Sequence, residues 1–457
     1  MSLAAAGCAT FSEDGGFRAV ETTVQERLGK DVKWARSPVE AESLRAVVAN
    51  ILAASLSADD AVQVALLNNR GLQAMYAELA IAEADLVQAG RLRNPHYSLS
   101  RVQRGQALPS IDEALSLEII SIMTLPLRSR MEARRFAAVQ FMVSERMLKL
   151  VQETRHAYFQ TLAADELVRY MDQVRESAAA AAELAQRMAE AGNFPALTRM
   201  REQAFNAEAM TNLVRARHAA VAAREKLMRL MGLTGVALRL PERLPDLPVM
   251  PAEPQDIELT ALRDRLDVQA AKQESARIAA SLGLSRATRF INVLELGRAR
   301  KKDADQPFSY GYEISVELPL FDWGGTRVAK AEALYMQSVE HVADVVITAR
   351  SEVREAYSAY RSAYESAKHY RDEIVPLRKR ISDETLLRYN GMLIGVFELL
   401  ADAREQIASV SNAIQALRDF WRAATDLQTA LTIGSPGMMT AARVGGVMPV
   451  AGVGSDH

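Results

Sequence analysis

The chain has 457 residues, of which 49% are hydrophobic and 25% are charged, and this composition excludes intrinsic disorder along the whole length. Its net charge of -2 provides no basic surface, so we predict no nucleic-acid partner. One cysteine and six scattered histidines exclude a disulfide framework and argue against a metal site. There is no apolar run of about 18 residues to form a membrane-spanning helix, although a β-barrel would escape that test because its strands alternate in polarity.

The first residues form a short apolar stretch that ends at Gly7 and Cys8 and is followed by polar residues. This order is similar to the end of a bacterial lipoprotein signal, in which the cysteine becomes acylated after cleavage. Only seven residues precede Cys8, fewer than the charged and apolar regions of a full signal need. Two interpretations therefore remain: a lipidated Cys8, or a lone cysteine in a frayed terminus.

Two segments about 200 residues apart share a pattern, which indicates an internal repeat. The segments are Gly192-Asn193-Phe194-Pro195-Ala196-Leu197 followed by Arg201-Glu202-Gln203, and Gly395-Val396-Phe397-Glu398-Leu399-Leu400 followed by Arg404-Glu405-Gln406. Leu-Pro-Leu also occurs twice, at 125–127 and 318–320. We interpret the chain as a tandem duplication. The expected parts are an N-terminal segment with an extended arm (1–55), a first repeat (56–240), a proline-rich linker (241–255), a second repeat (256–434) and a disordered tail (435–457).

Each repeat is predicted to begin with a helix and to continue with two strands. In the first repeat the helix runs from Ala61 to Ala89 without proline, and the strands are expected at 97–103 and 115–125. In the second repeat the strands are expected at 290–296 and 310–318. Residues 310–318 alternate strictly, with tyrosine and aliphatic side chains on one face and Glu313 and Glu317 on the other. Four strands with one apolar face cannot close a barrel alone, so we expect closure by other copies of the chain.

A very long helix is predicted after each strand pair. Residues 128–191 contain neither glycine nor proline, and such a helix would be about 96 Å long. The second repeat contains a heptad seam, which predicts a coiled coil. Its positions are Val339, Val346, Val353, Tyr360, Ala367, Ile374 and Ile381, alternating with Val342, Ala349, Ala356, Ala363, Tyr370 and Leu377. Pro376 should kink or break this helix. Gly192 and Gly395 are expected to end the long helices, and return helices follow at 197–231 and 399–431.

Several segments together resemble the TolC family of outer-membrane efflux proteins, from about Leu56 to Gly434. The segments are Leu56-Ser57-Ala58-Asp59-Asp60-Ala61 with Asn68-Asn69, Gln88-Ala89-Gly90 with Asn94-Pro95, Glu317-Leu318-Pro319-Leu320-Phe321-Asp322-Trp323-Gly324-Gly325, and Arg388-Tyr389-Asn390-Gly391 through Phe397-Glu398-Leu399-Leu400-Ala401-Asp402-Ala403. The resemblance implies a mainly α-helical fold with a membrane β-barrel. It implies a homotrimer with a twelve-stranded barrel in outer-membrane lipid, continued by a helical tunnel through the periplasm. It also favours acylation of Cys8, and hence a lipid anchor.

The function implied by the resemblance is passive conduction of substrates out of the cell. Expected partners are a periplasmic adaptor (a membrane fusion protein) and an inner-membrane pump, of the RND type. The resemblance assigns the following roles. Adaptor-docking hairpin tips comprise Gly192, Phe194, Leu197, Gly391, Gly395, Phe397 and Leu400, gate candidates are Glu398 and Asp402, and pore-lining residues are Glu313 and Glu317. For the two gate candidates a solvated helix face is an equal alternative.

No arrangement of residues typical of catalysis is present, and we predict neither an enzyme nor a cofactor. Gly324-Gly325-Thr326 lies between a strand and a helix, but it lacks the pattern of a phosphate-binding loop, so we interpret it as a turn. Two alternative functions remain open. One is the exit duct of a type I protein secretion system, and the other is a periplasmic coiled-coil adaptor or scaffold without a barrel.

Overall fold

The computed structural model describes residues 10–103, 108–192, 195–253, 255–290, 293–303, 306–317, 321 and 323–433, without the side chains of 396 and 397. Cys8, Phe194 and the predicted tail 435–457 therefore lie outside the described residues. The chain divides into two compact units, which we treat separately. Unit 1 comprises Met1–Thr23, Ala74–Ser144 and Leu266–Thr348. Unit 2 comprises Val24–Gln73, Glu145–Arg265 and Ala349–His457.

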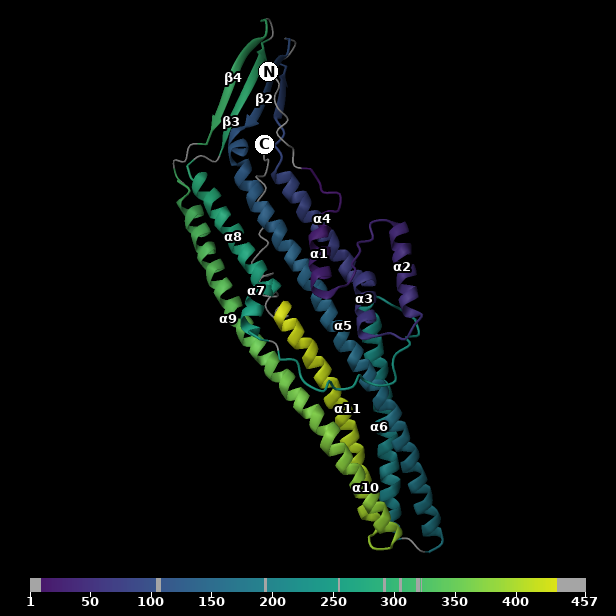
Figure 1. The fold of residues 1–457 in the computed structure, drawn as a ribbon. Coiled ribbons are helices and arrows are strands. Elements are labelled where there is room, and N and C mark those ends of the chain that lie inside the picture. The colour runs from purple at the N-terminus through teal and green to yellow at the C-terminus, as the bar shows by residue number, and fades with distance from the viewer. Residues whose placement is uncertain are drawn as a thin grey trace. The chain divides into compact units, whose positions relative to one another are not determined.

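The fold is mainly helical, as predicted, with one small sheet, and both halves of the chain have a similar order of elements (Figure 1). The first half contains α3 (Ala58–Asn68), α4 (Arg70–Ala89), β1 (His96–Val102), β2 (Ser110–Glu118), α5 (Ile119–Glu190) and α6 (Ala196–Leu230). The second half contains α7 (Ile257–Asp264), α8 (Leu266–Ala287), β3 (Leu294–Lys302), β4 (Ser309–Val316), α9 (Gly325–His369), the π-helix η1 (Tyr370–Ile374), α10 (Val375–Asn390) and α11 (Val396–Thr432).

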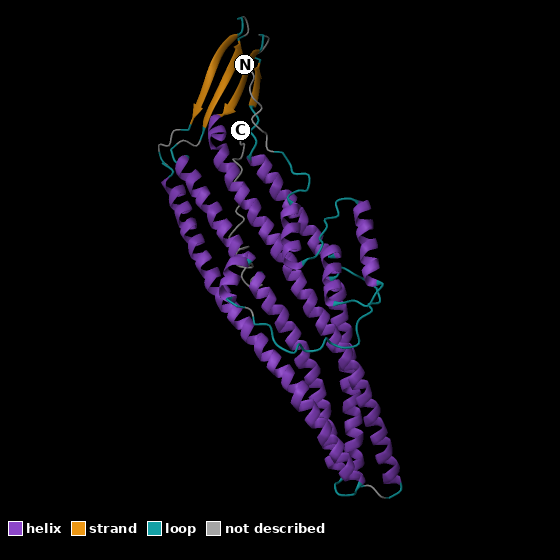
Figure 2. Ribbon diagram, in the orientation of Figure 1, coloured by secondary structure: helices purple, strands orange, loops and turns teal. Residues whose placement is uncertain are grey.

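Unit 1 contains the sheet, in which four antiparallel strands follow the order β1-β2-β3-β4 (Figure 2). The two predicted strand pairs thus join through β2 and β3. The register pairs Tyr97 with Leu115, Leu115 with Arg298, and Arg298 with Tyr312. Because residues directly opposite each other share a face, this row fixes the two faces of the whole sheet. Strands β1 and β4 are the edges, and among the described residues each has one side without a paired strand.

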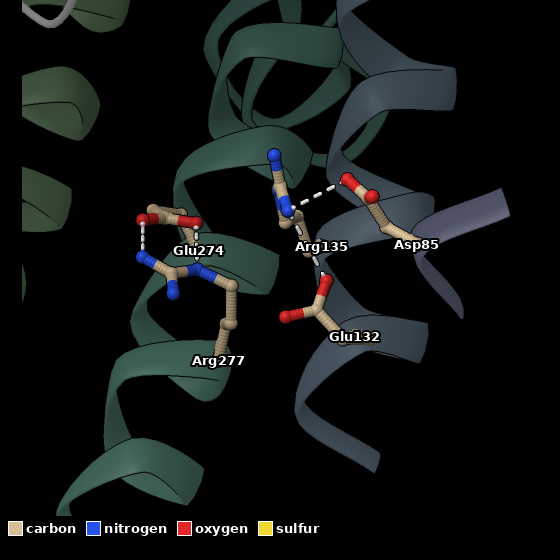
Figure 3. A network of polar contacts seen from close by, with 5 residues as sticks. All are labelled: Asp85, Glu132, Arg135, Glu274 and Arg277. Carbon is tan, nitrogen blue, oxygen red and sulfur yellow. Dashed lines mark hydrogen bonds and ion pairs between the residues drawn. The ribbon is translucent and has the colours of Figure 1, made fainter. Parts of the chain in front are cut away.

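The helices of unit 1 are joined by a polar network in addition to their apolar contacts (Figure 3). Arg135 on α5 reaches Asp85 on α4 at 3.0 Å and Glu132 at 3.3 Å. On α8, Glu274 accepts two hydrogen bonds from Arg277 at 2.8 and 2.6 Å. The hydrogen bonds that Arg277 donates to Glu274 raise the pKa of Arg277 in spite of its burial, and the charge of Glu132 adds to the rise. Since most of these side chains are partly exposed, each pair contributes at most about 1 kcal/mol to stability.

Aromatic packing forms the centre of unit 2 between α9 and α11. Phe420 is 1% exposed and its ring lies 5.6 Å from that of Tyr360 and 5.8 Å from that of Tyr364. The segment between α6 and α7 contains the predicted linker and is hydrogen-bonded to α9 and α11. The Tyr364 hydroxyl donates to the carbonyl of Val249 at 2.7 Å, and the Trp421 indole donates to that of Pro245 at 2.9 Å. The linker is therefore held by specific hydrogen bonds along α9 and α11.

The predicted single helix 61–89 is wrong, because Asn69 separates α3 from α4. The backbone of Asn69 is extended (φ -66°, ψ 118°), and its side-chain oxygen accepts from the amide of Leu72 at 3.0 Å. Its side-chain nitrogen donates to the carbonyl of Leu230 at 2.8 Å. That carbonyl belongs to the last residue of α6 and has no acceptor role within its helix. Asn69 therefore ends one helix, caps the next and satisfies the end of a third.

Two predicted strands are also misplaced. The expected strand 115–125 ends at Glu118, and α5 begins at Ile119 with Pro126 inside it. Side chains support this first part of α5: the Ser121 hydroxyl donates to the carbonyl of Glu118 at 2.8 Å, and Arg128 donates to the carbonyl of Ser121 at 2.7 Å. Neither bond reaches the carbonyl of Ile122, which lacks its helical donor because Pro126 has no amide hydrogen. The expected strand 290–296 instead runs from Leu294 to Lys302, because pairing with β2 extends it.

The expected extended arm within 1–55 contains two helices, α1 (Phe17–Leu28) and α2 (Pro38–Leu52). Ser37 and Glu40 form a capping box at the start of α2. In the second half, η1 ends two residues before Pro376, as expected for a proline that removes a helical hydrogen bond. The heptad seam is buried only in part. Ala349, Val353, Tyr360 and Ala367 are buried, whereas Val339, Leu377 and Ile381 are exposed.

Candidate functional site: the two-faced sheet and the hairpin turns

One face of the sheet in unit 1 carries large apolar side chains that none of the described residues covers. We name it the apolar face. The register places on it Tyr97, Leu99, Leu115, Leu117, Leu296, Tyr310, Tyr312, Ile314 and Val316, which are all exposed. Tyr312 is 88% exposed and Ile314 is 67% exposed. A contiguous exposed apolar surface of this kind marks an interface with lipid or protein.

The opposite face, which we name the polar face, carries small and charged side chains. Glu313 lies on it directly opposite Gly297, as the alternation predicted. The predicted strand end at residue 318 is too late, because β4 ends at Val316. Glu317 lies just beyond it, and its amide donates to the carbonyl of Val293 at 3.2 Å. The assignment of Glu313 and Glu317 to a pore stays a prediction.

Charged side chains interrupt the apolar face toward the turns of the β-hairpins, a feature that sequence reasoning missed. Glu113 and Arg300 face each other on β2 and β3 and form an ion pair at 2.7 Å. Arg101 and Lys302 lie one row further along the strands, on the same face. Continuing the alternation of Leu115 and Tyr312 toward the hairpins would have placed these charges, but only the register shows that they form adjacent rows.

The two helical hairpins of unit 2 turn at the repeated motif in different ways. In the first, Gly192 follows α5 in the left-handed region (φ +77°), and Pro195 caps α6. In the second, the expectation that Gly395 ends the long helix is wrong. Helix α10 ends at Asn390 with Gly391 as its cap, the left-handed residue is Met392 (φ +60°), and Gly395 is the N-cap of α11.

Apolar side chains are exposed at both turns. Leu197 in the first turn of α6 is 59% exposed, Met392 is 93% exposed and Leu393 is 77% exposed. Leu400 is half-buried in α11, and the side chain of Phe397 is not among those that the structure describes. Phe205 on α6 and Ile407 on α11 pack against the same buried cluster, and Arg404 on α11 lies over the Phe205 ring, so the starts of the two return helices adjoin within unit 2. The structure thus brings the described tip residues of both motifs to one end of unit 2.

The gate candidates differ in environment. Glu398 is exposed in the first turn of α11, where its amide donates to the carbonyl of Gly395 at 3.2 Å. Asp402, one turn later, is half-buried, and its Oδ2 atom is buried without a hydrogen-bond partner among the described residues. A solvated helix face therefore suits Glu398 but not Asp402.

A buried acid near these turns, Glu202 on α6, was not singled out from the sequence as a functional residue. Glu202 is 3% exposed, and its Oε2 atom has no hydrogen-bond partner in the described part of the chain. Burial raises the pKa of Glu202, and the positive charge of Arg404 on α11 opposes the rise. The Arg404 guanidinium stacks over Phe205, 4.6 Å from its ring centroid. The only signal in the sequence was the recurrence of Arg-Glu-Gln in both motifs.

Residues 259–431 match the model of the outer membrane efflux protein family. The predicted resemblance to outer-membrane efflux proteins is therefore confirmed. Among solved structures, this fold is similar to a membrane protein from Pseudomonas aeruginosa, with a TM-score of 0.71 and 20% identity over 82% of this chain and 93% of that chain. The open-state MtrE outer membrane channel of Neisseria gonorrhoeae has a TM-score of 0.69 and 19% identity, over 81% and 88%.

A third similar structure is CusC, described with the conformational changes of its folding and transmembrane channel formation. Its TM-score is 0.69 with 17% identity, over 82% of this chain and 92% of that chain. No curated protein sequence matches this chain. Within the described ranges, none of the helices is long and apolar enough to cross a membrane, and no group of three or more acidic, histidine or cysteine side chains could hold a metal ion.

Proposed function

We propose that this protein is the outer-membrane exit duct of a tripartite efflux system. The observation that carries the proposal is the four-stranded sheet with an exposed apolar face and two unpaired edge strands. In a bilayer, the edges β1 and β4 would leave backbone groups unsatisfied, at a cost of several kcal/mol each. Pairing of β4 with β1 of a neighbouring copy removes both edges. Three copies would supply twelve strands, enough for a closed barrel, whereas a single copy is below the smallest known barrels of about eight strands.

In this arrangement the apolar face contacts lipid and the polar face lines the pore. Glu313 and Glu317 would then keep the lumen hydrated. The helical part would continue the duct through the periplasm, and Cys8 would add a lipid anchor. The similar order of elements in both halves supports a tandem duplication, with boundaries at about 56–240 and 256–434. The fold similarity to the MtrE and CusC channels supports conduction without catalysis.

The hairpin turns are the proposed docking site for a periplasmic adaptor, which would connect the duct to an inner-membrane pump. Exposed apolar side chains such as Leu197 and Met392 would supply the contact area, and left-handed Gly192 would set the turn. Glu398, exposed at the start of α11, is the proposed gate residue. Three copies around an axis would bring three carboxylates together and favour cations over anions.

Two measurements test this function. The protein should resist extraction from membranes by alkaline carbonate and should form ion-conducting channels in planar bilayers after detergent purification. The substitution Glu398→Ala should raise conductance or weaken cation preference, whereas Asp419→Ala, an exposed carboxylate far along the same helix, should leave both unchanged. A protein released by carbonate without detergent would instead support the periplasmic scaffold. Gene deletion followed by sensitivity profiling with metals, dyes, detergents and antibiotics would separate efflux from protein secretion.

A further inference from the structure

The apolar face of the sheet is not uniformly apolar, and its charges are ordered along the strands. The rows nearest the helices, which include Leu117, Leu296 and Ile314, carry only aliphatic side chains. The next row adds Arg298 beside Tyr312, and the row after it contains Arg300 beside Tyr310. The last row, nearest the turns of the two β-hairpins, contains Arg101 on β1 and Lys302 on β3, with Ile111 between them. The face thus changes from aliphatic to cationic toward the β hairpins.

The cationic rows, which we define as Arg101, Arg298, Arg300 and Lys302, have an excess of positive charge. The only acidic side chain that the register places on this face is Glu113, which pairs with Arg300 at 2.7 Å. Within the part of the chain that the structure describes, the other three cations have no carboxylate partner. On the polar face the sign is reversed, with Asp112, Glu118, Glu295 and Glu313 against Lys301. If the apolar face contacts lipid, its excess of positive charge requires an anionic neighbour, because an unpartnered charge in an apolar environment is costly.

Aromatic rings hold the cations against the surface of the sheet. The Arg298 guanidinium lies 5.4 Å from the ring centroid of Tyr310, and that of Arg300 lies 4.3 Å from the ring centroid of Phe308. The Lys302 ammonium is 5.4 Å from the same Phe308 ring. Arg300 already pairs with Glu113, whereas the polar edge of the Arg298 guanidinium stays available for a second partner. A guanidinium is well suited to bind phosphate oxygens with two hydrogen bonds.

We propose that the cationic rows bind the phosphate groups of a phosphorylated lipid whose acyl chains lie along the aliphatic rows of the same face. The inference rests on the proposed membrane function, since it requires the apolar face to contact a bilayer. From Arg298 to Lys302 the rows extend over about 13 Å along the strand, comparable to the headgroup layer at the edge of the hydrocarbon core. The β-hairpin end of the sheet is the end remote from the helices. Because the helical part of the proposed duct lies in the periplasm, this end of the sheet lies in the outer leaflet, and the lipid belongs to that leaflet.

The test uses the full-length protein in lipid nanodiscs of phosphatidylcholine with a small fraction of purified diphosphorylated lipid A. Retained lipid A is counted by native mass spectrometry. The matched pair of variants is Lys302→Gln and Lys301→Gln, which remove the same charge from adjacent residues on opposite faces. Loss of one surface cation should weaken lipid A binding about five-fold, whereas Lys301→Gln should not weaken it. The triple variant Arg101→Gln, Arg298→Gln and Lys302→Gln should bind about 100-fold more weakly.

The remaining arms identify the ligand and separate this proposal from the function. Lipid A stripped of its phosphates should not be retained, and inorganic phosphate at the same concentration should not displace intact lipid A, because it lacks acyl chains. Equal effects of the two lysine variants, or undiminished binding by the triple variant, would overturn the proposal. If wild-type protein conducts in bilayers of phosphatidylcholine but retains no lipid A, only this inference fails. If it does not insert into bilayers at all, the proposed function fails with it.

Discussion

Arg265, at the end of α7, is the buried charge whose removal should most affect unit 2. Its side chain is 1% exposed and reaches Glu352 on α9 at 2.7 Å. It also reaches the carbonyls of Ala349 at 3.4 Å and Ala430 at 3.3 Å. Ala430 lies in the last turn of α11, where carbonyls lack helical donors. Arg265 therefore plays the part in the second half that Asn69 plays in the first, where it satisfies the carbonyl of Leu230.

The substitution Arg265→Met should destabilise the protein by about 3 kcal/mol. Removing one member of a buried ion pair costs about 3 to 5 kcal/mol, and the lower figure applies because the side chain of Glu352 is 23% exposed and keeps some hydration. For a unit of this size the loss corresponds to a fall in melting temperature of roughly 6 °C. Circular dichroism in detergent at one fixed scan rate would measure it. Hydrogen exchange should show faster opening of α7 in particular.

Two further variants control this result. Arg263→Met removes an exposed arginine from the same helix and should change stability by less than about 0.5 kcal/mol. The double variant Arg265→Met with Glu352→Met should be more stable than Arg265→Met alone, because no charge is left unpaired. A melting temperature of Arg265→Met within 1–2 °C of wild type, on the order of the Arg263→Met effect, would contradict the assigned role. So would a double variant no more stable than the single one.

Two other predictions concern unit 2. Gly232→Ala should destabilise the protein by more than Gly235→Ala. Both glycines have left-handed backbones, in which an added side chain costs about 1 to 2 kcal/mol, but only at Gly232 would the new Cβ lie 2.4 Å from the carbonyl oxygen of Asn68. Equal melting temperatures of the two variants would refute the contact. Burial raises the pKa of Glu202, so the folded state holds a proton to higher pH than the unfolded state, and the free energy of unfolding should fall as pH rises above about 4.5. Glu202→Gln should remove this pH dependence, which amounts to at most about 1.4 kcal/mol per pH unit. Denaturation series between about pH 4 and 7 would measure it, and the same slope of the free energy of unfolding against pH in both proteins would contradict the prediction.

The sequence determined which segments become helices and strands wherever one local signal was strong. The glycine-free and proline-free run after residue 128, the alternation of residues 310–316 and the proline-rich linker each predicted an element that the structure contains. Local patterns succeed there because burial of one face repeats with the period of the element itself. The family resemblance came from the same local motifs, in order along the chain.

Tertiary contacts decided where elements end and which faces meet. Asn69 breaks an otherwise continuous helical pattern because the end of α6 offers its carbonyl to the side chain, and no local signal contains that partner. The extension of β3 to Lys302 depends on pairing with β2, which lies almost 200 residues earlier. The cationic rows illustrate the same point for the site. Each charge is visible in the sequence, but only the register, a non-local property, places Arg101, Arg298 and Lys302 together on the apolar face.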